Sequence, residues 1–283
     1  MMQELLTEEE TVMGCPRCGQ AESRKNGKDR RGNQVYECTL CARTFTALTD
    51  SPFSGYRFPP DVIALAVRSY LRYRLSDADV CEWLAERGVQ VDRSTVYDWV
   101  QLFAPLYQEA ARPHRHRVGR RWAVDETYVK VAGVWQYVYR AIDDLGQVID
   151  VFVSETRDAA AAASFFCRAL ESTGVTPRRV TTDKAAAYPP ALAAILPEVD
   201  HETGKMLQQA IERDQQHLKG RYASMRGFKT GRSAQVFWRA HGFARNLSDG
   251  FYHLGSSMGD PREPRPPLLM RAWDALTARL LAR

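Results

Sequence analysis

The sequence contains no long hydrophobic run and no leader-like N-terminal segment. Its most apolar stretches, such as residues 159–170, are short and bounded by charged residues, whereas a bilayer-spanning helix needs roughly 20 apolar residues. The first ten residues are acidic and lack the basic-then-apolar pattern of a signal peptide. We therefore expect a cytoplasmic protein with no membrane partner.

Composition excludes a disordered or fibrous chain, because hydrophobic residues make up 45% and charged residues 26% of the sequence. A length of 283 residues allows more than one domain. The net charge of +5 fits nucleic-acid binding but is also common elsewhere. Between Arg112 and Arg121 there are five arginines, two histidines and no acid. This stretch is either a phosphate-contacting surface, with Arg117 and Arg120 as candidate DNA contacts, or a solvated linker.

Four of the six cysteines form two Cys-x-x-Cys pairs, Cys15 with Cys18 and Cys38 with Cys41. Each pair can place two thiolates at adjacent corners of a tetrahedron, which is the pattern of a structural zinc site. Two disulfides are the alternative, which a cytoplasmic location disfavours. The pattern predicts a Zn²⁺-binding ribbon over residues 1–50.

Residues 58–112 show helical periodicity. Apolar residues recur at helical spacing from residue 62 to 71, Ser76 is a candidate N-cap, and a turn at Gly88 precedes a third helix over 93–103. A helix-turn-helix domain reads DNA with the start of its last helix. The candidate DNA contacts at this start are Arg93, Ser94, Thr95 and Tyr97. A small helical bundle without DNA-binding activity would show the same spacing.

Strand-like patterns dominate from about residue 118 to 254. Segments 124–131, 134–142 and 148–153 are rich in β-branched and aromatic residues, and 179–182 is a short apolar run. Helical patterns cover 159–170, 190–196 and 211–225. This order predicts an α/β, ribonuclease-H-like catalytic core with a mixed five-stranded sheet flanked by helices. Residues 255–283 form a tail with an amphipathic helix, which either packs on the core or contacts another subunit.

Three acids occupy informative positions in this predicted core. Asp125 lies on the first strand, Asp183 follows the fourth, and Glu212 begins a basic helical stretch. Because the first and fourth strands are neighbours in this fold, the two aspartates should face one another. Carboxylates suit Mg²⁺ or Mn²⁺, and paired metals promote in-line phosphoryl displacement.

Each acid also has an ordinary interpretation. Asp125 could end a strand, Asp183 could cap a helix, and Glu212 could form a surface pair. Other nearby acids, Glu126 among them, are interpreted as turn, cap or exposed-face residues.

Four segments together resemble the transposases of the insertion-sequence-six family. They are Trp122-Ala-Val-Asp-Glu-Thr-Tyr-Val-Lys-Val131, Trp135-Gln-Tyr-Val-Tyr-Arg-Ala-Ile-Asp143, Thr182-Asp-Lys-Ala-Ala-Ala-Tyr-Pro189 and Leu218-Lys-Gly-Arg with Met225-Arg-Gly-Phe-Lys229. The resemblance implies a DDE transposase that binds terminal inverted repeats, nicks DNA and joins the 3′-hydroxyl to target DNA by a replicative, cointegrate-forming route. It assigns the catalytic, Mg²⁺-binding positions to Asp125, Asp183 and Glu212.

The resemblance also implies partners and further DNA contacts. Lys219 and Arg221 match basic family positions, and Lys184 adjoins Asp183; all three are candidate DNA contacts. Double-stranded DNA, a homodimer or higher homo-oligomer and association with the nucleoid are expected. Gln208-Gln209 and Asp214-Gln215 replace the paired asparagines and the Asp-His that family members usually carry. The alternative is therefore a catalytically inactive, transposase-derived DNA-binding regulator.

Overall fold

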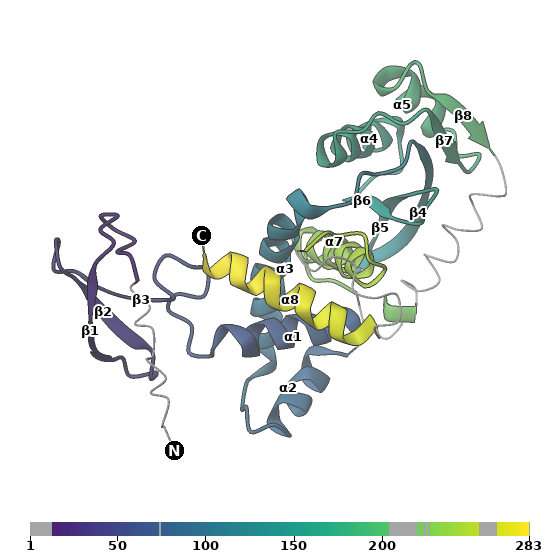
Figure 1. Ribbon diagram of the computed structural model, residues 1–283. Coiled ribbons are helices and arrows are strands. Elements are labelled where there is room, and N and C mark those ends of the chain that lie inside the picture. The colour runs from purple at the N-terminus through teal and green to yellow at the C-terminus, as the bar shows by residue number, and fades with distance from the viewer. Residues whose placement is uncertain are drawn as a thin grey trace. The chain divides into compact units, whose positions relative to one another are not determined.

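The computed structural model describes residues 13–73, 75–203, 220–222, 225, 227–254 and 265–282, with backbone alone for 265–268 (Figure 1). The chain divides into two compact units, Met1–Val62 with Thr277–Arg283, and Ile63–Leu276. The four-part division expected from the sequence stays a prediction. Among the described residues, no helix combines the length and apolarity that a membrane crossing requires.

The first unit contains a small antiparallel sheet in the order β1 (Ser23–Lys28), β2 (Gln34–Cys38), β3 (Thr44–Thr46). The turn between β1 and β2 is held by Asp29, whose carboxylate accepts hydrogen bonds from the backbone N–H groups of Arg31 and Asn33 at 2.8 and 2.9 Å. Cys15, Cys38 and Phe45 form the buried core of this sheet. So small a core needs additional stabilisation to fold.

Three helices come next along the chain: α1 (Pro60–Arg72), most of which belongs to the second unit, α2 (Asp77–Ala85) and α3 (Arg93–Ala111). Ser76 and Asp79 form a capping box at the start of α2, and the Asp92 side chain caps α3 by accepting the Ser94 N–H. The last helix extends beyond the predicted 93–103. Its buried face continues through Tyr107 to Ala111, so tertiary packing lengthens it although Pro105 lies within it.

The central sheet of the second unit has the strand order β6-β5-β4-β7-β8. The strands are β4 (Arg121–Val131), β5 (Val134–Asp143), β6 (Val148–Ser154), β7 (Arg179–Thr182) and β8 (Asp200–Thr203). The first three pair antiparallel, whereas β7 is parallel to both β4 and β8. This is the order of a ribonuclease-H-like sheet, which confirms the predicted fold class. The polar strand β8 was not located from the sequence.

Helices cover both faces of the sheet (Figure 1). On one face, α4 (Ala159–Thr173) and α5 (Tyr188–Ile195) bury Phe165, Phe166 and Tyr188 against the sheet residues Trp122, Val124 and Tyr139. On the other lies α7 (Gly231–Ser248), where Gln235 and Asn246 form hydrogen bonds with the backbone of β6.

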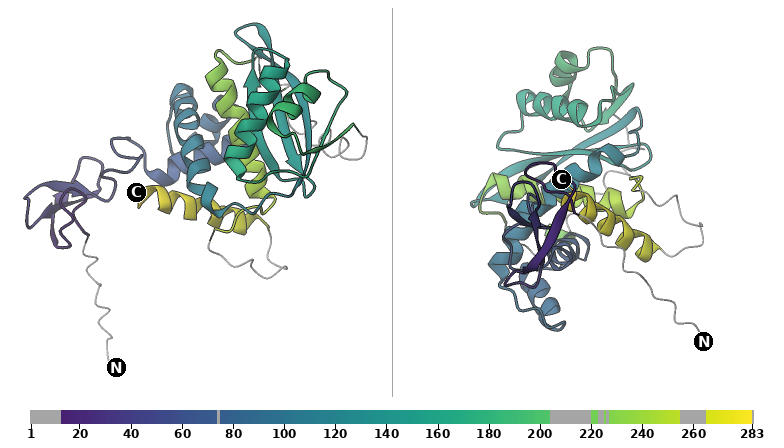
Figure 2. Two further views of the ribbon diagram at one scale, coloured as in Figure 1. Left: turned by 90° about the horizontal axis from the view of Figure 1, so that it is seen from above. Right: turned by 60° about the vertical axis from the view of Figure 1, so that its left-hand side comes forward.

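Helix α7 also connects the sheet with the helical part of this unit. It lies between β6 and α3 (Figure 2) and contacts both of them. Trp273 on α8 (Arg265–Leu281) packs edge-on against Tyr107 and Phe243, with ring centroids 4.9 and 5.7 Å apart. One face of the C-terminal helix therefore packs on its own chain, which was one of the two alternatives predicted.

Candidate active site

Asp125, Glu126 and Asp183 form an acid cluster in which ligand oxygens all lie within 4.8 Å of one another. Asp125 and Glu126 lie on β4, and Asp183 directly follows β7. The parallel pairing of β4 with β7 runs from Arg121 with Arg179 to Ala123 with Thr181. Two further residues along each strand bring Asp125 level with Asp183, as the sequence predicted from neighbouring strands.

Backbone hydrogen bonds orient the two aspartates. Asp125 Oδ1 accepts the N–H of Glu126 at 2.9 Å, which holds this carboxylate against the backbone of its own strand. Asp183 Oδ1 accepts the N–H of Ala185 at 2.9 Å. Asp183 does not cap α5, because that helix begins at Tyr188 with Ala187 as its N-cap residue. Asp125 does not end a strand either, since β4 continues to Val131.

Glu126 belongs to this cluster, and its interpretation as a turn, cap or exposed-face acid was wrong. Its side chain is 3% exposed and pairs with Arg157, and it accepts a hydrogen bond from Tyr188 Oη. Burial, followed by the nearby Glu126 carboxylate, raises the pKa of Tyr188 well above its usual value, so the phenol remains a donor. The signal available in the sequence was its position directly after Asp125.

The donor set of the acid cluster fits a divalent cation. Carboxylate oxygens are the preferred ligands of Mg²⁺. Arg157, in the loop before α4, lies 3.4 Å from Asp183 Oδ2 as well as pairing with Glu126. Three carboxylates beside one guanidinium leave an excess of negative charge, which a divalent ion would balance.

Glu212 and Lys219 lie outside the described residues. Further along the chain, the Tyr222 hydroxyl accepts a hydrogen bond from the Lys130 N–H at 2.8 Å. Phe228 then pairs with the end of β4, where its N–H donates to Lys130 O at 2.8 Å and its carbonyl accepts from Ala132 N–H at 2.7 Å. The segment that follows Glu212 is thus attached to the strand that carries Asp125.

The position of Arg221 contradicts its predicted role as a DNA contact. The residue is 2% exposed, and Nη2 donates to the carbonyls of Tyr70 and Leu75 at 2.9 and 2.8 Å. Its guanidinium also lies over the Tyr70 ring, 4.6 Å from the centroid. A buried guanidinium engaged in this way cannot reach a phosphate at the surface, so Arg221 joins the segment after Glu212 to the end of α1.

The other candidate DNA contacts occupy more accessible positions. At the start of α3, Arg93, Ser94 and Tyr97 are exposed and Thr95 is half-buried. Lys184, beside Asp183, is exposed, as are Arg117 and Arg120. Ser94 also serves the cap of α3, because its hydroxyl donates to Asp92 Oδ1 at 2.6 Å.

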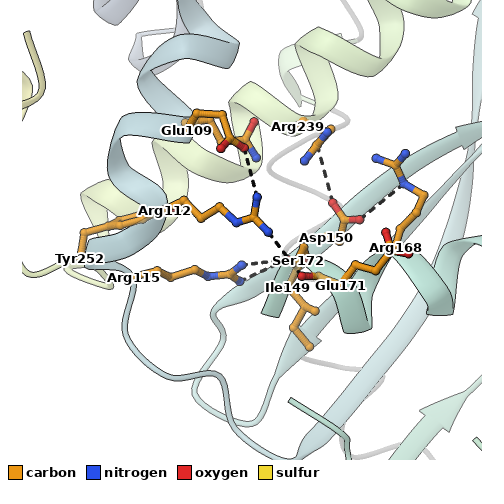
Figure 3. Close-up of a pocket in the computed structure, with 11 residues that line it drawn as sticks. Glu109, Arg112, Arg115, Ile149, Asp150, Arg168, Glu171, Ser172, Arg239 and Tyr252 are labelled. Atoms are coloured by element: carbon orange, nitrogen blue, oxygen red, sulfur yellow. Dashed lines mark hydrogen bonds and ion pairs between the residues drawn. The ribbon is translucent and has the colours of Figure 1, made fainter. Parts of the chain in front are cut away.

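The arginine-rich stretch is not one continuous phosphate-binding surface. Arg112 and Arg115 line a cavity of about 290 Å³ that also contains Asp150, Arg168 and Arg239 (Figure 3). Arg115 donates to Gln147 Oε1 at 2.7 Å and to the carbonyl of Ile149 at 3.2 Å. Asp150, 4% exposed, lies 3.7 Å from each of the other two arginines. These ion pairs and hydrogen bonds stabilise the packing of the end of α3, β6, α4 and α7.

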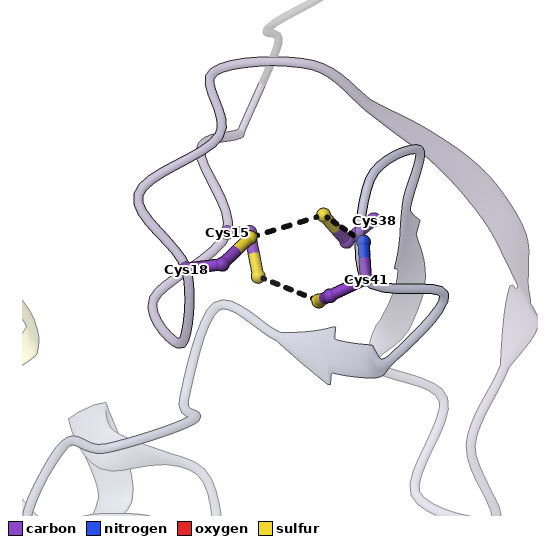
Figure 4. Close-up of side chains that lie close together, drawn as sticks. All are labelled: Cys15, Cys18, Cys38 and Cys41. Atoms are coloured by element: carbon purple, nitrogen blue, oxygen red, sulfur yellow. Dashed lines mark hydrogen bonds between the residues drawn. The ribbon is translucent and has the colours of Figure 1, made fainter.

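The four paired cysteines converge in the first unit (Figure 4). The Sγ atoms of Cys15 and Cys41 are 3.8 Å apart, and those of Cys18 and Cys38 are 3.5 Å apart. Zn–S bonds of about 2.3 Å place the sulfurs of a tetrahedral site about 3.8 Å apart. Hydrogen bonding from the Cys41 backbone N–H lowers the pKa of Cys38 to about 6 and favours its thiolate. Against the lowering effect of the Gln20 backbone, the Sγ contact with Cys38 raises the pKa of Cys18, so the fit to zinc rests on the sulfur spacing. The cluster therefore fits zinc.

The sheet order and the acids at the junction of β4 with β7 define a polynucleotidyl transferase of the DDE class. A family model described as "DDE domain" matches residues 119–250. The Staphylococcus aureus transposase for insertion sequence-like element IS431mec is 38% identical over 186 residues, which cover 64% of this chain and 83% of that protein. A second S. aureus transposase, for element IS257 in transposon Tn4003, is 37% identical with the same coverage. The chain belongs to the insertion-sequence-six family of DDE transposases.

Solved integrase structures show weaker likeness. The HTLV-2 integrase catalytic core in complex with magnesium is 16% identical, with a TM-score of 0.33 over 56% of this chain and 86% of that one. The catalytic core of BIV integrase is 14% identical, with a TM-score of 0.34 over 53% and 94%. The fold assignment rests on the strand order of the central sheet.

Proposed function

We propose that this transposase binds the terminal inverted repeats of its element, nicks DNA to expose a 3′-hydroxyl and joins that hydroxyl to target DNA by metal-dependent transesterification. The observation that carries the proposal is the convergence of Asp125 and Asp183, 58 positions apart in the sequence, within one acid cluster. Acids brought together from two strands are costly unless a cation balances them.

Asp125, Asp183 and Glu212 are the proposed ligands of Mg²⁺ or Mn²⁺. Divalent metal, when bound, would stabilise the attacking and leaving oxygens of an in-line displacement. In the nicking step, a P–O bond forms to water as the bond to the 3′-oxygen breaks. In the joining step, a P–O bond forms to that 3′-oxygen as one bond of the target strand breaks. Neither step consumes a further reactant.

The surrounding side chains position this chemistry. Arg157 orients Glu126 and Asp183, while Tyr188 holds the Glu126 carboxylate from the α5 side. Exposed Lys184 adjoins Asp183 and is available to a strand phosphate. The attachment of Tyr222 to β4 supports an approach of Glu212, ten positions earlier, to the same strand.

End recognition is assigned to the helix-turn-helix segment. Its last helix presents Arg93, Ser94 and Tyr97 at an exposed N-terminus, with Thr95 beside them, which is the part that reads the major groove in such domains. Arg117 and Arg120 are proposed backbone contacts. Holding two element ends together requires at least a homodimer. A protein with these activities is expected at the nucleoid. The zinc ribbon is proposed as a further domain before the helix-turn-helix segment.

The decisive experiment incubates purified full-length protein with labelled DNA from both flanks of its coding sequence, Mg²⁺ and a target plasmid. Asp125→Asn, Asp183→Asn and Glu212→Gln should each reduce nicking and joining by at least about 1000-fold, corresponding to ~4 kcal/mol of lost transition-state stabilisation. Binding of the flanking DNA should survive. The matched control is Asp144→Asn, an exposed acid in the turn after β5.

Three outcomes separate the alternatives. Full strand transfer by any of the three variants would remove that residue from the site. Nicking without joining by the wild type would indicate a nuclease, and sequence-specific binding without either reaction would indicate a transposase-derived regulator. In cells, products that fuse donor and target plasmids with two element copies would support the replicative, cointegrate-forming route, and simple insertions would contradict it.

A further inference from the structure

A row of three aromatic side chains and one lysine, mostly exposed, continues from the acid cluster toward the β4–β5 turn. The aromatic row consists of Tyr128 and Lys130 on β4 with Tyr137 and Trp135 on β5. Register pairs Tyr128 with Tyr137 and Lys130 with Trp135, so the four side chains share one face of the sheet. Tyr128 is 51% and Trp135 57% exposed. Large aromatic surfaces displayed together indicate a contact surface.

The aromatic row is continuous with the candidate active site. Glu126 occupies the same face, because it pairs with Tyr139 in the register that precedes Tyr128 and Tyr137. Two residues along a strand correspond to about 7 Å. Burial lowers the pKa of Arg157, but Glu126, with which it pairs, and then Tyr128 raise that pKa above its usual value, which indicates that Tyr128 lies near this guanidinium. A DNA strand bound at the acids would therefore pass over or beside this row.

The row is held on a rigid support. The strands β4 and β5 are paired from Trp122 with Asp143 to Val131 with Val134. Beyond the last pair, the chain turns through Ala132 and Gly133, both at positive φ, and the Ala132 N–H donates to Phe228 O at 2.7 Å. The rings of Tyr128 and Tyr137 have centroids 5.3 Å apart. Pre-ordered rings lose little conformational freedom on binding.

The chemistry of the row matches unpaired nucleotides. Flat aromatic rings stack on exposed bases, whereas the bases of a duplex already stack on each other. Lys130 Nζ lies 5.6 Å from the Trp135 ring centroid and supplies a cation for a phosphate. Resting on the proposed function, we propose that the aromatic row stacks unpaired bases of the DNA strand beside the acid cluster.

Fluorescence anisotropy tests this proposal with two probes, a fluorescein-labelled (dT)12 strand and a blunt 12-base-pair duplex, in buffer without Mg²⁺. Trp135→Ala and Tyr128→Ala should each weaken binding of (dT)12 by about tenfold, the loss expected for one stacked base. Binding of the duplex should change by less than about twofold on the same reasoning. Trp135→Phe keeps a stacking ring and should bind (dT)12 like the wild type.

A control variant tests whether the effect is specific to the row, and a fluorescent base reports stacking directly. Leu145→Ala removes a side chain that is 71% exposed in the β5–β6 turn, at the opposite end of β5 from Trp135, and it should leave both affinities unchanged. A 2-aminopurine base within the single strand should lose fluorescence when bound to the wild type and keep it with Trp135→Ala. Circular dichroism spectra should be unchanged in all variants, because the altered side chains are exposed.

Three results would contradict the proposal that the aromatic row stacks unpaired bases. Absence of (dT)12 binding by the wild type, or unchanged affinity in both alanine variants, would overturn the stacking assignment. Equal losses for single strand and duplex would show a general DNA contact instead. Dissociation of an oligomer with unchanged (dT)12 affinity would assign the row to a subunit interface. These tests need no catalysis, so loss of strand transfer in the proposed-function experiment would be a separate result.

Discussion

The guanidinium of Arg157 lies 3.4 Å from Asp183 Oδ2 while it also pairs with Glu126. One cation thus joins acids that come from two different strands. Glu126 contributes a side chain that is only 3% exposed, and its carboxylate contacts this guanidinium and the Tyr188 hydroxyl. Arg157 therefore has the geometry of a positioning residue for the acid cluster.

Replacing Arg157 with alanine should slow nicking about 10- to 100-fold at saturating Mg²⁺, because about 1.5–3 kcal/mol of charge-assisted hydrogen bonding is lost. Removal of a competing positive charge should also lower the Mn²⁺ concentration that gives half-maximal rate. Arg157→Lys, which keeps the charge without the fork of donors, should show an intermediate rate and a smaller shift. An unchanged rate together with an unchanged metal dependence would contradict this role.

The four-cysteine site should bind one Zn²⁺ per chain, measurable by plasma mass spectrometry. Cys38→Ser should lower the zinc content to a small fraction and make the segment around β1–β3 sensitive to protease, because the buried cluster there is small and includes two of the four cysteines, Cys15 and Cys38, beside Phe45. Treatment of the wild type with a zinc chelator should have the same effect on protease sensitivity. Cys167→Ser is the control, since that residue lies on α4 and is not one of the four clustered cysteines. Full zinc content in Cys38→Ser would exclude the site.

Arg221→Ala should reduce the free energy of unfolding by about 2–4 kcal/mol, measured by urea denaturation. The variant leaves the carbonyls of Tyr70 and Leu75 without a charged donor in a buried position. The slope of DNA affinity against salt concentration should not change. Lys184→Ala should show the opposite result: the free energy of unfolding should not change, and the slope of log DNA affinity against log salt concentration should fall by about one. A reduced salt slope with unchanged stability in Arg221→Ala would restore its predicted phosphate contact.

His201 should make stability depend on pH below neutrality. Burial lowers its pKa from 6.5, although Asp200 opposes the shift, and its Nε2 lies 2.9 Å from Thr182 Oγ1. The unfolded chain then binds a proton near pH 6.5, where the folded chain does not, so stability falls as pH decreases below 6.5. The melting temperature should decline between pH 7 and 5.5. His201→Gln should reduce that decline, and an identical pH profile would contradict the assignment.

Much of the secondary structure was predictable because its signals are local. Ser76 and Asp92 mark helix starts through hydrogen bonds to residues two or three positions away. Alternating β-branched and aromatic residues marked β4, β5 and β6. The polar strand β8 carries no such alternation, and its place at the sheet edge depends on pairing with β7. The family motifs identified the activity class, while the catalytic assignment of Glu212 stays a prediction outside the described residues.

The sequence by itself determined the spacing of the four cysteines, the helix caps and the positions of Asp125 and Asp183 on their strands, because these depend on near neighbours. Only the tertiary structure placed Glu126 in the acid cluster and buried Arg221. Arg157 meets Glu126 and Asp183 across 31 and 26 positions, and Arg221 meets Tyr70 across 151. Such partners come together only when the sheet and helices have packed, so no local sequence pattern predicts these contacts.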